Sequence, residues 1–426
     1  MLELNKIKTN KNQIIQSLNK RGADLTSIIN EVINLNESRI SCQKILDTQL
    51  HKGNVMAKEI GVIAKENKGL IPKELLSKAT IIREESKKED IRLKEIKENI
   101  QSLLIQIPNI THINVPLGKS EQDNTVEYEW GEISDISKCI NPHWDIAEKY
   151  NIIDFETGAK IAGSGFPLYK GKGAKLQRGL INFFIDYNTD AGYEEYIPPF
   201  FVNEKSAFNT GQIPDKEGMM YHIKDDSLFV IPTSEIPITN IFNDVKFKQT
   251  DLPIKCTAYS PCFRREAGSY GKEVRGLNRL HQFDKVEIVQ ICEPDKSYDV
   301  LNEMVEHVST LLKKLNLKFR IIKLCGGDLG FTAALTYDFE VYSGAQKKWL
   351  EVSSVSNFET YQSNRLNLKY IDSDKKSKLC HTLNGSSLAL PRIVAAILEN
   401  NQTSEGIVMP KILYKYLNFK TITNSK

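Results

Sequence analysis

The sequence predicts an α+β protein with a helical part, residues 1–107, and a larger mixed part, residues 108–426. Pro72 is the only proline before Pro108, and apolar residues recur there at helical spacing. After Pro108, prolines, glycines and aromatic residues become frequent, and short β-branched runs follow one another. Few of these runs are separated by helices long enough for a parallel crossover. An antiparallel sheet with flanking helices is therefore favoured over a doubly wound parallel sheet.

The helical part begins with a short helix, which we expect over residues 11–20 and which Arg21-Gly22 ends. A long helix is expected over about 25–65. Glu66–Gly69 and Pro72 then form a turn, because glycine and proline interrupt helices. The next helix must run back along the first, since the turn between them is short.

A second long helix, over 72–107, carries a coiled-coil seam. Its seam positions alternate steps of four and three residues, and seven of the nine are apolar. At about 1.5 Å per residue, a hairpin of two such helices reaches roughly 50 Å. We expect so long a hairpin to project into solvent. The seam positions are Leu75, Ala79, Ile82, Ser86, Glu89, Leu93, Ile96, Ile100 and Leu103.

The larger part alternates short strands and helices. A helix is expected over 175–191, an extended segment interrupted by Pro198-Pro199 over 193–202, and a buried helix over 388–400. The strand candidates are 228–231, 286–292, 318–324, 339–342 and 349–352.

Composition places the chain among globular proteins, with 40% apolar and 26% charged residues. No apolar run approaches the roughly 20 residues of a membrane span, and no secretory or transit leader precedes the first helix. We therefore expect a cytoplasmic protein without a membrane partner.

The seven cysteines are scattered, with no CxxC pair and no His/Cys group at zinc-site spacing. We expect reduced, buried thiols and no zinc.

Charge is unevenly distributed along the chain. Residues 1–119 carry a net charge of +6, whereas the remaining residues carry −3. The excess indicates an anionic partner for the helical part, although a solvated helix surface explains it equally well.

The stretch Cys262–Val289, CFRREAGSYGKEVRGLNRLHQFDKVEIV, is the densest in charged and aromatic residues. Two extended segments flank a basic, glycine-rich connection, and strand alternation would place Arg264 and Glu266 on one face. These residues alone are compatible with a surface ion-pair ladder. They are also compatible with a nucleotide site, in which arginines bind phosphate and an aromatic ring stacks on a base. Neither a Walker loop nor GxGxxG after a strand is present.

The pattern F-R-x-E, a loop, then R-x-x-x-F resembles motif 2 of the class II aminoacyl-tRNA synthetases, and its full string resembles the seryl-tRNA synthetase family of bacterial type. Other segments agree along nearly the whole chain. Ile197-Pro198-Pro199 is similar to motif 1, and the hairpin 25–107 to the family's tRNA-binding arm. The remaining matching segments are Thr233-Ser234-Glu235, Glu351–Asn357, and motif 3 from His381 through Ser386 to Arg392.

The resemblance implies a class II catalytic domain over 108–426 that binds ATP with Mg²⁺. Glu351 and Ser354 are expected to ligate the Mg²⁺ ion, which prefers oxygen ligands. Arg264 and Arg392 are expected to be catalytic. The residues implied to bind ATP are Arg264, Arg265, Glu266, Arg279, Phe283, Glu351, Val352, Ser353, Ser354 and Arg392.

Individual roles follow from the same resemblance. Arg264 is expected to hold the α-phosphate and the serine carboxylate, and Arg279 the distal phosphates. Glu266 would accept a hydrogen bond from the adenine amino group. Phe283 and Arg392 would cover the two faces of the adenine ring. Taken singly, Phe283 would more often be a core residue than a stacking platform.

The resemblance also implies a pocket for L-serine. Glu287 is the candidate partner of the serine hydroxyl, and such a pocket rejects alanine because its polar groups would be left unpaired. The implied serine-binding residues are Thr233, Ser234, Glu235, Arg264, Glu287, Asn384 and Ser386.

The implied reaction is formation of seryl-adenylate, followed by transfer of the seryl group to the terminal adenosine of tRNA-Ser by a homodimer. Selenocysteine tRNA is a further candidate partner. Two alternatives stay open: a paralogue that loads an amino acid onto a carrier protein, and a non-enzymatic scaffold that uses the coiled coil.

Overall fold

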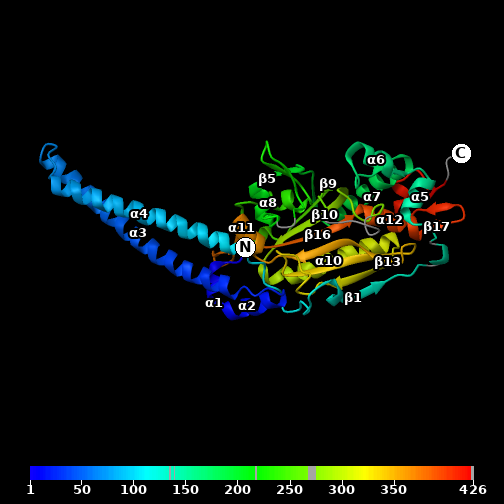
Figure 1. The fold of residues 1–426 in the computed structure, drawn as a ribbon, viewed down its shortest axis with the longest axis horizontal. Coiled ribbons are helices and arrows are strands. Elements are labelled where there is room, and N and C mark those ends of the chain that lie inside the picture. The colour runs from blue at the N-terminus through cyan, green and yellow to red at the C-terminus, as the bar shows by residue number, and fades with distance from the viewer. Residues whose placement is uncertain (134–135, 139, 216–217, 267–274, 424–426) are drawn as a thin grey trace. The chain divides into compact units, whose positions relative to one another are not determined.

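The computed structural model describes residues 1–133, 136–138, 140–215, 218–266 and 275–423. They form two compact units (Figure 1). The first unit comprises Met1–Asn19 and Ala23–Pro108, and the second comprises Lys20–Gly22 and Asn109–Lys426. The middle of the motif 2 stretch, residues 267–274, lies outside the described residues, as does Cys139.

The first unit is helical, and its two long helices pair as an antiparallel hairpin (Figure 1). Gly53 on one helix lies against Ile82 on the other, and Cys42 Sγ donates to the carbonyl oxygen of Glu89 at 3.4 Å. The helices of this unit are α1 (Leu4–Thr9), α2 (Lys11–Lys20), α3 (Thr26–Glu66) and α4 (Lys73–Leu104). The predicted helix over 11–20 and the predicted hairpin are confirmed. Helix α1 was not predicted, because six residues are too few to show a helical period.

The predicted seam of α4 is the face that packs against α3. Leu93, Ile96 and Ile100 are at most 8% exposed. All nine predicted positions are buried or half-buried, whereas most residues between them are exposed. The coiled-coil spacing therefore identified the packed face, which supplies the apolar burial that a long helix needs in water.

The second unit is built on an eight-stranded sheet with the order β1-β11-β12-β13-β16-β10-β9-β4. All neighbouring strands are antiparallel except β4 and β9, which are parallel, so the predicted antiparallel sheet is confirmed. The strands of this sheet are β1 (Thr125–Trp130), β4 (Glu194–Tyr196), β9 (Ile254–Phe263), β10 (Gln282–Cys292), β11 (Phe319–Lys323), β12 (Leu335–Ser343), β13 (Lys348–Asn357) and β16 (His381–Ala389).

Helices cover one face of this sheet, and strand alternation separates that face from the other. On β10, Val286 and Ile288 point into the main hydrophobic core. Lys285 and Glu287 point to the opposite face and line a cavity. The core is completed by the apolar faces of three helices, α7 (Gly171–Asp190), α10 (Ser297–Leu315) and α12 (Leu390–Asn400).

Two of these helices were predicted from the sequence. Helix α7 begins four residues before the predicted start at Lys175, and α12 begins two residues after Leu388. Pro391 lies in the first turn of α12, where the missing N–H costs no hydrogen bond. The other helices of the unit are α5 (His143–Lys149), α6 (Phe155–Ala162), α8 (Glu204–Thr210), α9 (Glu235–Asn240) and α11 (Tyr361–Leu366).

Small sheets complete the unit. One of them contains the predicted strand near 228–231, here β7 (Leu228–Val230), between β5 (Phe201–Asn203) and β6 (Tyr221–Ile223). The remaining strands are β2 (Ile153–Asp154), β3 (Leu168–Tyr169), β8 (Lys246–Lys248), β14 (Lys369–Ile371), β15 (Ser377–Leu379), β17 (Gln402–Thr403), β18 (Gly406–Val408) and β19 (Thr421–Ile422).

Among the residues described, no helix combines the length and apolarity of a membrane span. The six described cysteines are buried and carry free thiols.

Candidate active site

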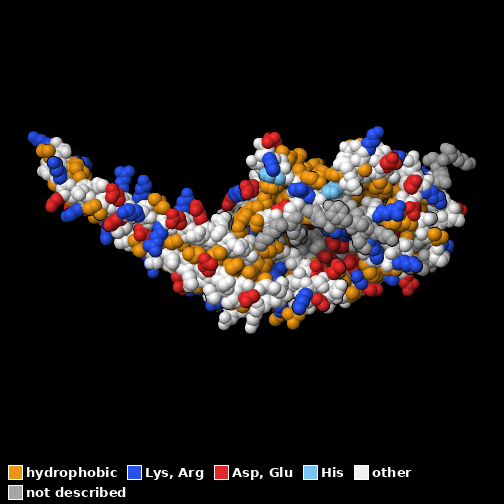
Figure 2. Space-filling model, in the orientation of Figure 1, with side chains coloured by type: hydrophobic (Ala, Val, Ile, Leu, Met, Phe, Trp, Pro, Cys, Tyr) orange, Lys and Arg blue, Asp and Glu red, His pale blue; other side chains and the backbone are white. Residues whose placement is uncertain are grey.

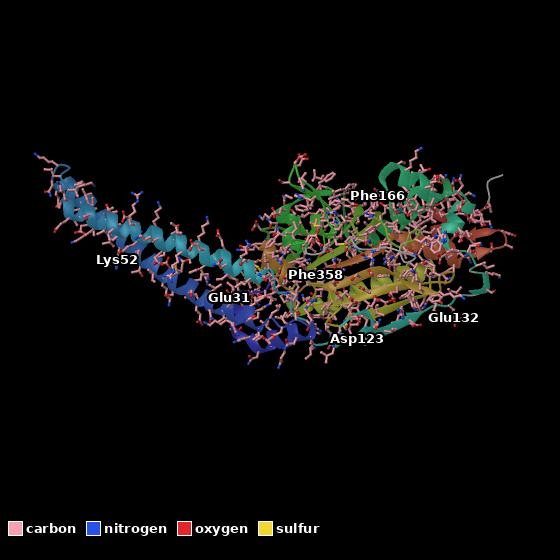
Figure 3. The ribbon with its side chains drawn as sticks, viewed as in Figure 1. Glu31, Lys52, Asp123, Glu132, Phe166 and Phe358 are labelled. Carbon is pink, nitrogen blue, oxygen red and sulfur yellow. The ribbon has the colours of Figure 1, made fainter. Side chains whose placement is uncertain are left out.

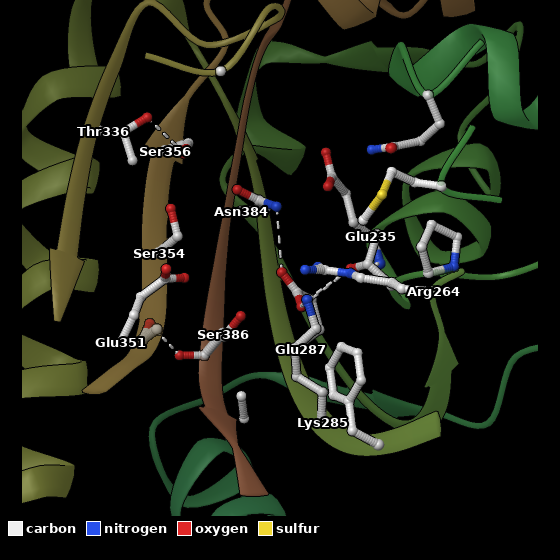
Figure 4. Close-up of a pocket in the computed structure, with 18 of the residues that line it drawn as sticks. Glu235, Arg264, Lys285, Glu287, Thr336, Glu351, Ser354, Ser356, Asn384 and Ser386 are labelled. Carbon is white, nitrogen blue, oxygen red and sulfur yellow. Dashed lines mark hydrogen bonds and ion pairs between the residues drawn. The ribbon is translucent and has the colours of Figure 1, made fainter. Parts of the chain in front are cut away.

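A cavity of about 780 Å³ opens on the face of the sheet away from the main core (Figure 4). Strands β10, β12, β13 and β16 contribute to its floor, and the first turn of α12 closes one side. Fourteen of the sixteen residues that the sequence assigned to ATP or serine line it. They are Thr233, Glu235, Arg264, Glu266, Arg279, Phe283, Glu287, Glu351, Val352, Ser353, Ser354, Asn384, Ser386 and Arg392.

Arg264 follows directly after β9 and lies over an aromatic ring. Its backbone N–H donates to the carbonyl oxygen of His281 at 2.9 Å, which continues the β9–β10 ladder by one residue. Its guanidinium carbon lies 5.2 Å from the centre of the Phe283 ring. The guanidinium is thus supported from one side by the ring and directed into the cavity, ready to bind an anion.

Glu266 reaches the cavity by a turn and not by strand alternation. As expected, Arg264 and Glu266 face the cavity and Arg265 does not, but the cause differs, because β9 ends at Phe263 and Glu266 adopts a φ of 48°. Its carboxylate forms an ion pair with Arg279 on the returning arm. The turn therefore joins the two arms of motif 2 through a carboxylate and a guanidinium.

Two assigned residues do not line the cavity. Arg265 is exposed, and its backbone N–H donates to the carbonyl oxygen of Met219 at 2.8 Å. Ser234 is fully buried, and its hydroxyl lies 2.6 Å from that of Ser260. Ser234 sits immediately before α9, so the structure places it beneath the cavity wall that its neighbours Thr233 and Glu235 form.

One end of the cavity holds a buried group of charged side chains (Figure 4). Glu287 is inaccessible to solvent, and it accepts hydrogen bonds from Thr233 and Asn384, each at 3.3 Å. Lys285 forms an ion pair with Glu287 and donates to Thr233 Oγ1 at 2.9 Å. Burial raises the pKa of Glu287, and Lys285 acts against this shift.

Glu235 is the second buried carboxylate of this group. Burial, and next the Glu287 carboxylate, raise the pKa of Glu235 to about 7. Gln362 donates to it at 2.6 Å, and Thr382 holds Gln362 with a further hydrogen bond of 2.7 Å. Among the buried side chains that the structure describes, the group has two carboxylates and one cation, and the Arg264 guanidinium acts on Glu287 as well. A ligand with an ammonium group would offset the second carboxylate.

Sequence reasoning missed Lys285 as a site residue. It precedes Glu287 by two residues on β10, so strand alternation places both on one face, and this signal was present in the sequence. Gln362 was also missed. Its link to Glu235 spans 127 residues, and no local pattern indicates it.

The donor set assigned to Mg²⁺ fits a hard cation. Glu351 and Ser354 lie on β13, and Asp338 on β12 is paired with Ser354 in the ladder. Asp338 Oδ1 is buried and has no hydrogen-bond partner. Burial, and next the Glu351 carboxylate, raise the pKa of Asp338 well above its usual value. Crowded carboxylates beside a hydroxyl are a suitable oxygen environment for Mg²⁺. The described residues contain no group of three or more His, Cys, Asp or Glu side chains arranged to hold a metal.

Arg392 connects motif 3 to two other parts of the site. Its Nε donates to the carbonyl oxygen of Asn278 at 3.0 Å, and its Nη1 donates to that of Glu351 at 2.8 Å. The first turn of α12 thereby holds Arg392 between motif 2 and the strand that carries the Mg²⁺ donors. The cavity as a whole presents Arg264, Arg279 and Arg392 together with a group of buried carboxylates, and Arg264 lies beside that group. It is therefore suited to a polyphosphate and to a small ligand with an ammonium group.

The comparisons with known proteins agree with this geometry. Residues 1–111 match the family described as the seryl-tRNA synthetase N-terminal domain, and residues 221–401 match the class II tRNA synthetase core domain (G, H, P, S and T). A serine–tRNA ligase of Salinibacter ruber is 44% identical over 99% of both chains. The chain belongs to the seryl-tRNA synthetase family. A serine–tRNA ligase of Clostridium tetani is 40% identical over 99% of this chain and 100% of that one.

Two solved structures of family members share the whole fold. The seryl-tRNA synthetase of Pyrococcus horikoshii, complexed with ATP, matches with a TM-score of 0.90 and 32% identity, and the match covers 100% of both chains. The cytoplasmic serine–tRNA ligase of Naegleria fowleri, in complex with AMP, matches with a TM-score of 0.86 and 26% identity over 100% of this chain and 99% of that one.

Proposed function

We propose that the cavity is the adenylation site of this family member. The chain activates L-serine with ATP to seryl-adenylate and then transfers the seryl group to the 3′-terminal adenosine of tRNA-Ser. One observation carries the assignment to this cavity. Segments that lie more than 150 residues apart in the chain, from Thr233 to Arg392, bring their polar side chains to one volume of about 780 Å³.

Positioning and charge stabilisation perform the first step. A serine carboxylate oxygen attacks the α-phosphorus of ATP, and pyrophosphate leaves on the opposite side. Arg264 binds the carboxylate and the α-phosphate, and so offsets the charge that grows on the phosphoryl oxygens. No protein nucleophile is needed, because holding the reactants in line supplies much of the rate enhancement.

The remaining motif residues orient ATP. Phe283 stacks on the adenine ring, Arg392 covers its other face, and Glu266 accepts from its amino group. Arg279 binds the distal phosphates, after its present partner Glu266 has turned to the base. Glu351 and Ser354 would hold Mg²⁺, with Asp338 beside them. The ion would supply positive charge to the phosphate oxygens.

The buried carboxylates select serine. Glu235 accepts from the serine ammonium, and Glu287 pairs with the serine hydroxyl, with Thr233, Asn384 and Ser386 completing the pocket. Lys285 holds Glu287 in place and keeps the pocket close to neutral once serine is bound. Alanine has no hydroxyl for Glu287 and so forgoes a hydrogen bond to a charged group, which is worth about 1.5–3 kcal/mol.

The hairpin of α3 and α4 binds tRNA. Lysines and arginines are interspersed with acidic residues along it (Figures 2 and 3), which suits backbone contacts to double-helical RNA. Lys52, labelled on α3 in Figure 3, is exposed and is one such candidate.

The active form is a homodimer in the cytoplasm. In this dimer the motif 1 contacts would cover Ile197, which follows β4 and is 87% exposed in the single chain. Selenocysteine tRNA is a second substrate of the same arm.

Serine binding should weaken as the pH falls below about 7. The Glu235 carboxyl has a pKa of about 7 in the free protein. It is therefore neutral at lower pH and ionised at higher pH, whereas the serine ammonium stays charged throughout. The KM for serine in ATP–pyrophosphate exchange should rise up to tenfold per pH unit below 7 and level off above it. Glu235→Gln should raise the KM and remove this dependence. An unchanged KM for serine between pH 6 and 8 would contradict the assignment.

Shortening the hairpin should separate the two half-reactions. Deleting residues 54–81, and joining Gly53 to Ile82 by a short glycine linker, uses two residues that already lie in contact across the hairpin. Serine-dependent ATP–pyrophosphate exchange should stay within about twofold, while charging of tRNA-Ser should fall at least about 100-fold, because phosphate contacts are lost.

The same assay separates the alternatives. If the full chain exchanges pyrophosphate with serine but never charges tRNA, the carrier-protein alternative is supported. If it shows no serine-dependent exchange at all, the scaffold alternative is supported. Equal charging by the full and shortened chains would refute the assignment of the hairpin to tRNA.

A further inference from the structure

A buried histidine–glutamate pair lies behind the ATP part of the cavity and takes no part in its lining. His143, the first residue of α5, and Glu399, near the end of α12, are both inaccessible to solvent. His143 Nδ1 lies 2.7 Å from Glu399 Oε1, and the backbone N–H of His143 donates to the same oxygen at 3.0 Å. Burying such a pair costs desolvation free energy. Its hydrogen bonds must therefore offset that cost, or the pair must have a function that explains it.

The contacts determine where the imidazole proton lies. The backbone N–H of Leu277 donates to His143 Nε2 at 2.8 Å, so Nε2 must present its lone pair. The proton is then on Nδ1 and is donated to Glu399. Burial acts to raise the pKa of Glu399, but its hydrogen bonds, first the one from His143, more than offset this and lower the pKa below its usual value. The carboxylate is therefore ionised and orients the ring toward Leu277.

Leu277 belongs to the return segment, which we define as Arg275–His281. This segment follows the motif 2 loop and carries Arg279 into the cavity. It is pressed onto α5, since Gly276 adopts a φ of 68° and a Cβ there would lie 2.3 Å from His143 Nε2. The Arg275 guanidinium also lies over the Trp144 ring at 4.8 Å.

Glu399 extends the contacts to motif 3. Gln346, in the turn between β12 and β13, donates to Glu399 Oε1 at 2.8 Å and accepts from Asn278 Nδ2 at 2.9 Å. The carbonyl oxygen of Asn278 in turn accepts from Arg392 Nε. The Ser343 hydroxyl bonds the other oxygen of Glu399. A closed ring of hydrogen bonds thus joins α5, the return segment, the β12–β13 turn and α12.

We propose that His143 and Glu399 are positioning residues that hold the return segment, and with it Arg279 and Arg392, in the arrangement that binds ATP. Neither side chain lines the cavity, and the pair acts through the lining residues Leu277 and Asn278 and through Gln346. This inference rests on the proposed function, because it requires Arg279 and Arg392 to contact ATP.

The test measures the binding of ATP and the binding of serine separately. In His143→Phe, an aromatic ring is kept but the acceptor for Leu277 N–H and the donor to Glu399 are lost. The KM for ATP in serine-dependent ATP–pyrophosphate exchange, and the Kd of ATP by calorimetry, should both rise at least tenfold. The KM for serine should stay within twofold. In His143→Gln, the amide oxygen can accept from Leu277 N–H, and the KM for ATP should return to within about threefold of the original.

A matched control removes a buried hydrogen bond elsewhere. Tyr193→Phe removes the acceptor of Gln290 Nε2, a bond of 2.7 Å in the same unit and outside the cavity. Its melting temperature should fall without a change in either KM. An ATP KM of His143→Phe that is unchanged, or that rises in parallel with the serine KM, would overturn the inference.

A second variant decides the matter if His143→Phe does not fold. Glu399→Gln keeps the volume but turns an NH₂ group toward donors, and it should raise the KM for ATP at least threefold with the serine KM unchanged. Equal ATP KM values would overturn the inference. The original chain separates the two proposals, because absence of its serine-dependent exchange would refute the proposed function, whereas normal variants would refute only the positioning role.

Discussion

Replacing Arg264 by alanine should lower serine-dependent ATP–pyrophosphate exchange by at least about 1,000-fold. The guanidinium is directed into the cavity and supported by the Phe283 ring at 5.2 Å. It is the group that offsets the charge growing on the α-phosphate, and it also binds the serine carboxylate, so both reactants lose their common anchor. The fold should survive, because the backbone hydrogen bond from Arg264 to His281 does not depend on the side chain.

The neighbouring arginine is a matched control for this variant. Arg265 is exposed and outside the cavity, so Arg265→Ala should keep exchange within about twofold. Arg264→Lys should recover little of the rate, since an ammonium cannot bind two oxygens in the plane of a guanidinium. Near-normal exchange by Arg264→Ala would refute the assignment of this cavity to adenylate formation.

Replacing Glu287 by glutamine should lower kcat/KM for serine by about 100-fold to 1,000-fold. The carboxylate is inaccessible and bonds Lys285, Thr233 and Asn384. An amide there leaves the Lys285 ammonium without its buried counter-charge and places an NH₂ group against other donors. The KM for ATP should change by less than threefold, because the nucleotide occupies another part of the cavity.

Selectivity gives a second measurement on the same variant. The ratio of serine to alanine activation should fall, since Glu287 no longer discriminates the hydroxyl. Glu293→Gln is the control: Glu293 is a carboxylate only 3% exposed, just past the end of β10, outside the cavity and paired with Lys296 at 2.6 Å. Glu293→Gln should leave the KM for serine and the KM for ATP within twofold of the original values. An unaltered serine-to-alanine ratio in Glu287→Gln would show that the hydroxyl binds elsewhere.

The sequence predicted the helical hairpin well because its signal is local. The seam of α4 repeats every three or four residues, so it can be recognised from residues within this one helix. Strands β10 and β13 were each located with one end correct to within a residue, but β10 begins at Gln282, before the predicted 286, and β13 runs on to Asn357, past the predicted 352, since strands here extend beyond the β-branched runs. The prediction of 339–342, for example, lies inside a strand that spans Leu335–Ser343.

The site was predicted through the resemblance of short segments to a family. The way these segments come together depends instead on which strands pair in the sheet. Glu287 stands opposite Ser386 because β10 pairs with β16, and opposite Ala258 because β10 pairs with β9. The strand order in the sheet does not follow the chain. No spacing in the sequence states which strand lies beside which.

By itself, the sequence determined which faces of helices and strands are apolar, where the turns come, and which short motifs are present. Each of these depends on neighbours a few residues away. Only the tertiary structure decided that Glu266 enters the cavity through a left-handed turn, that Lys285 neutralises a buried carboxylate, and that His143 supports Leu277 from 134 residues away. These features depend on burial and on distances across the sheet, and both arise only when the whole core packs.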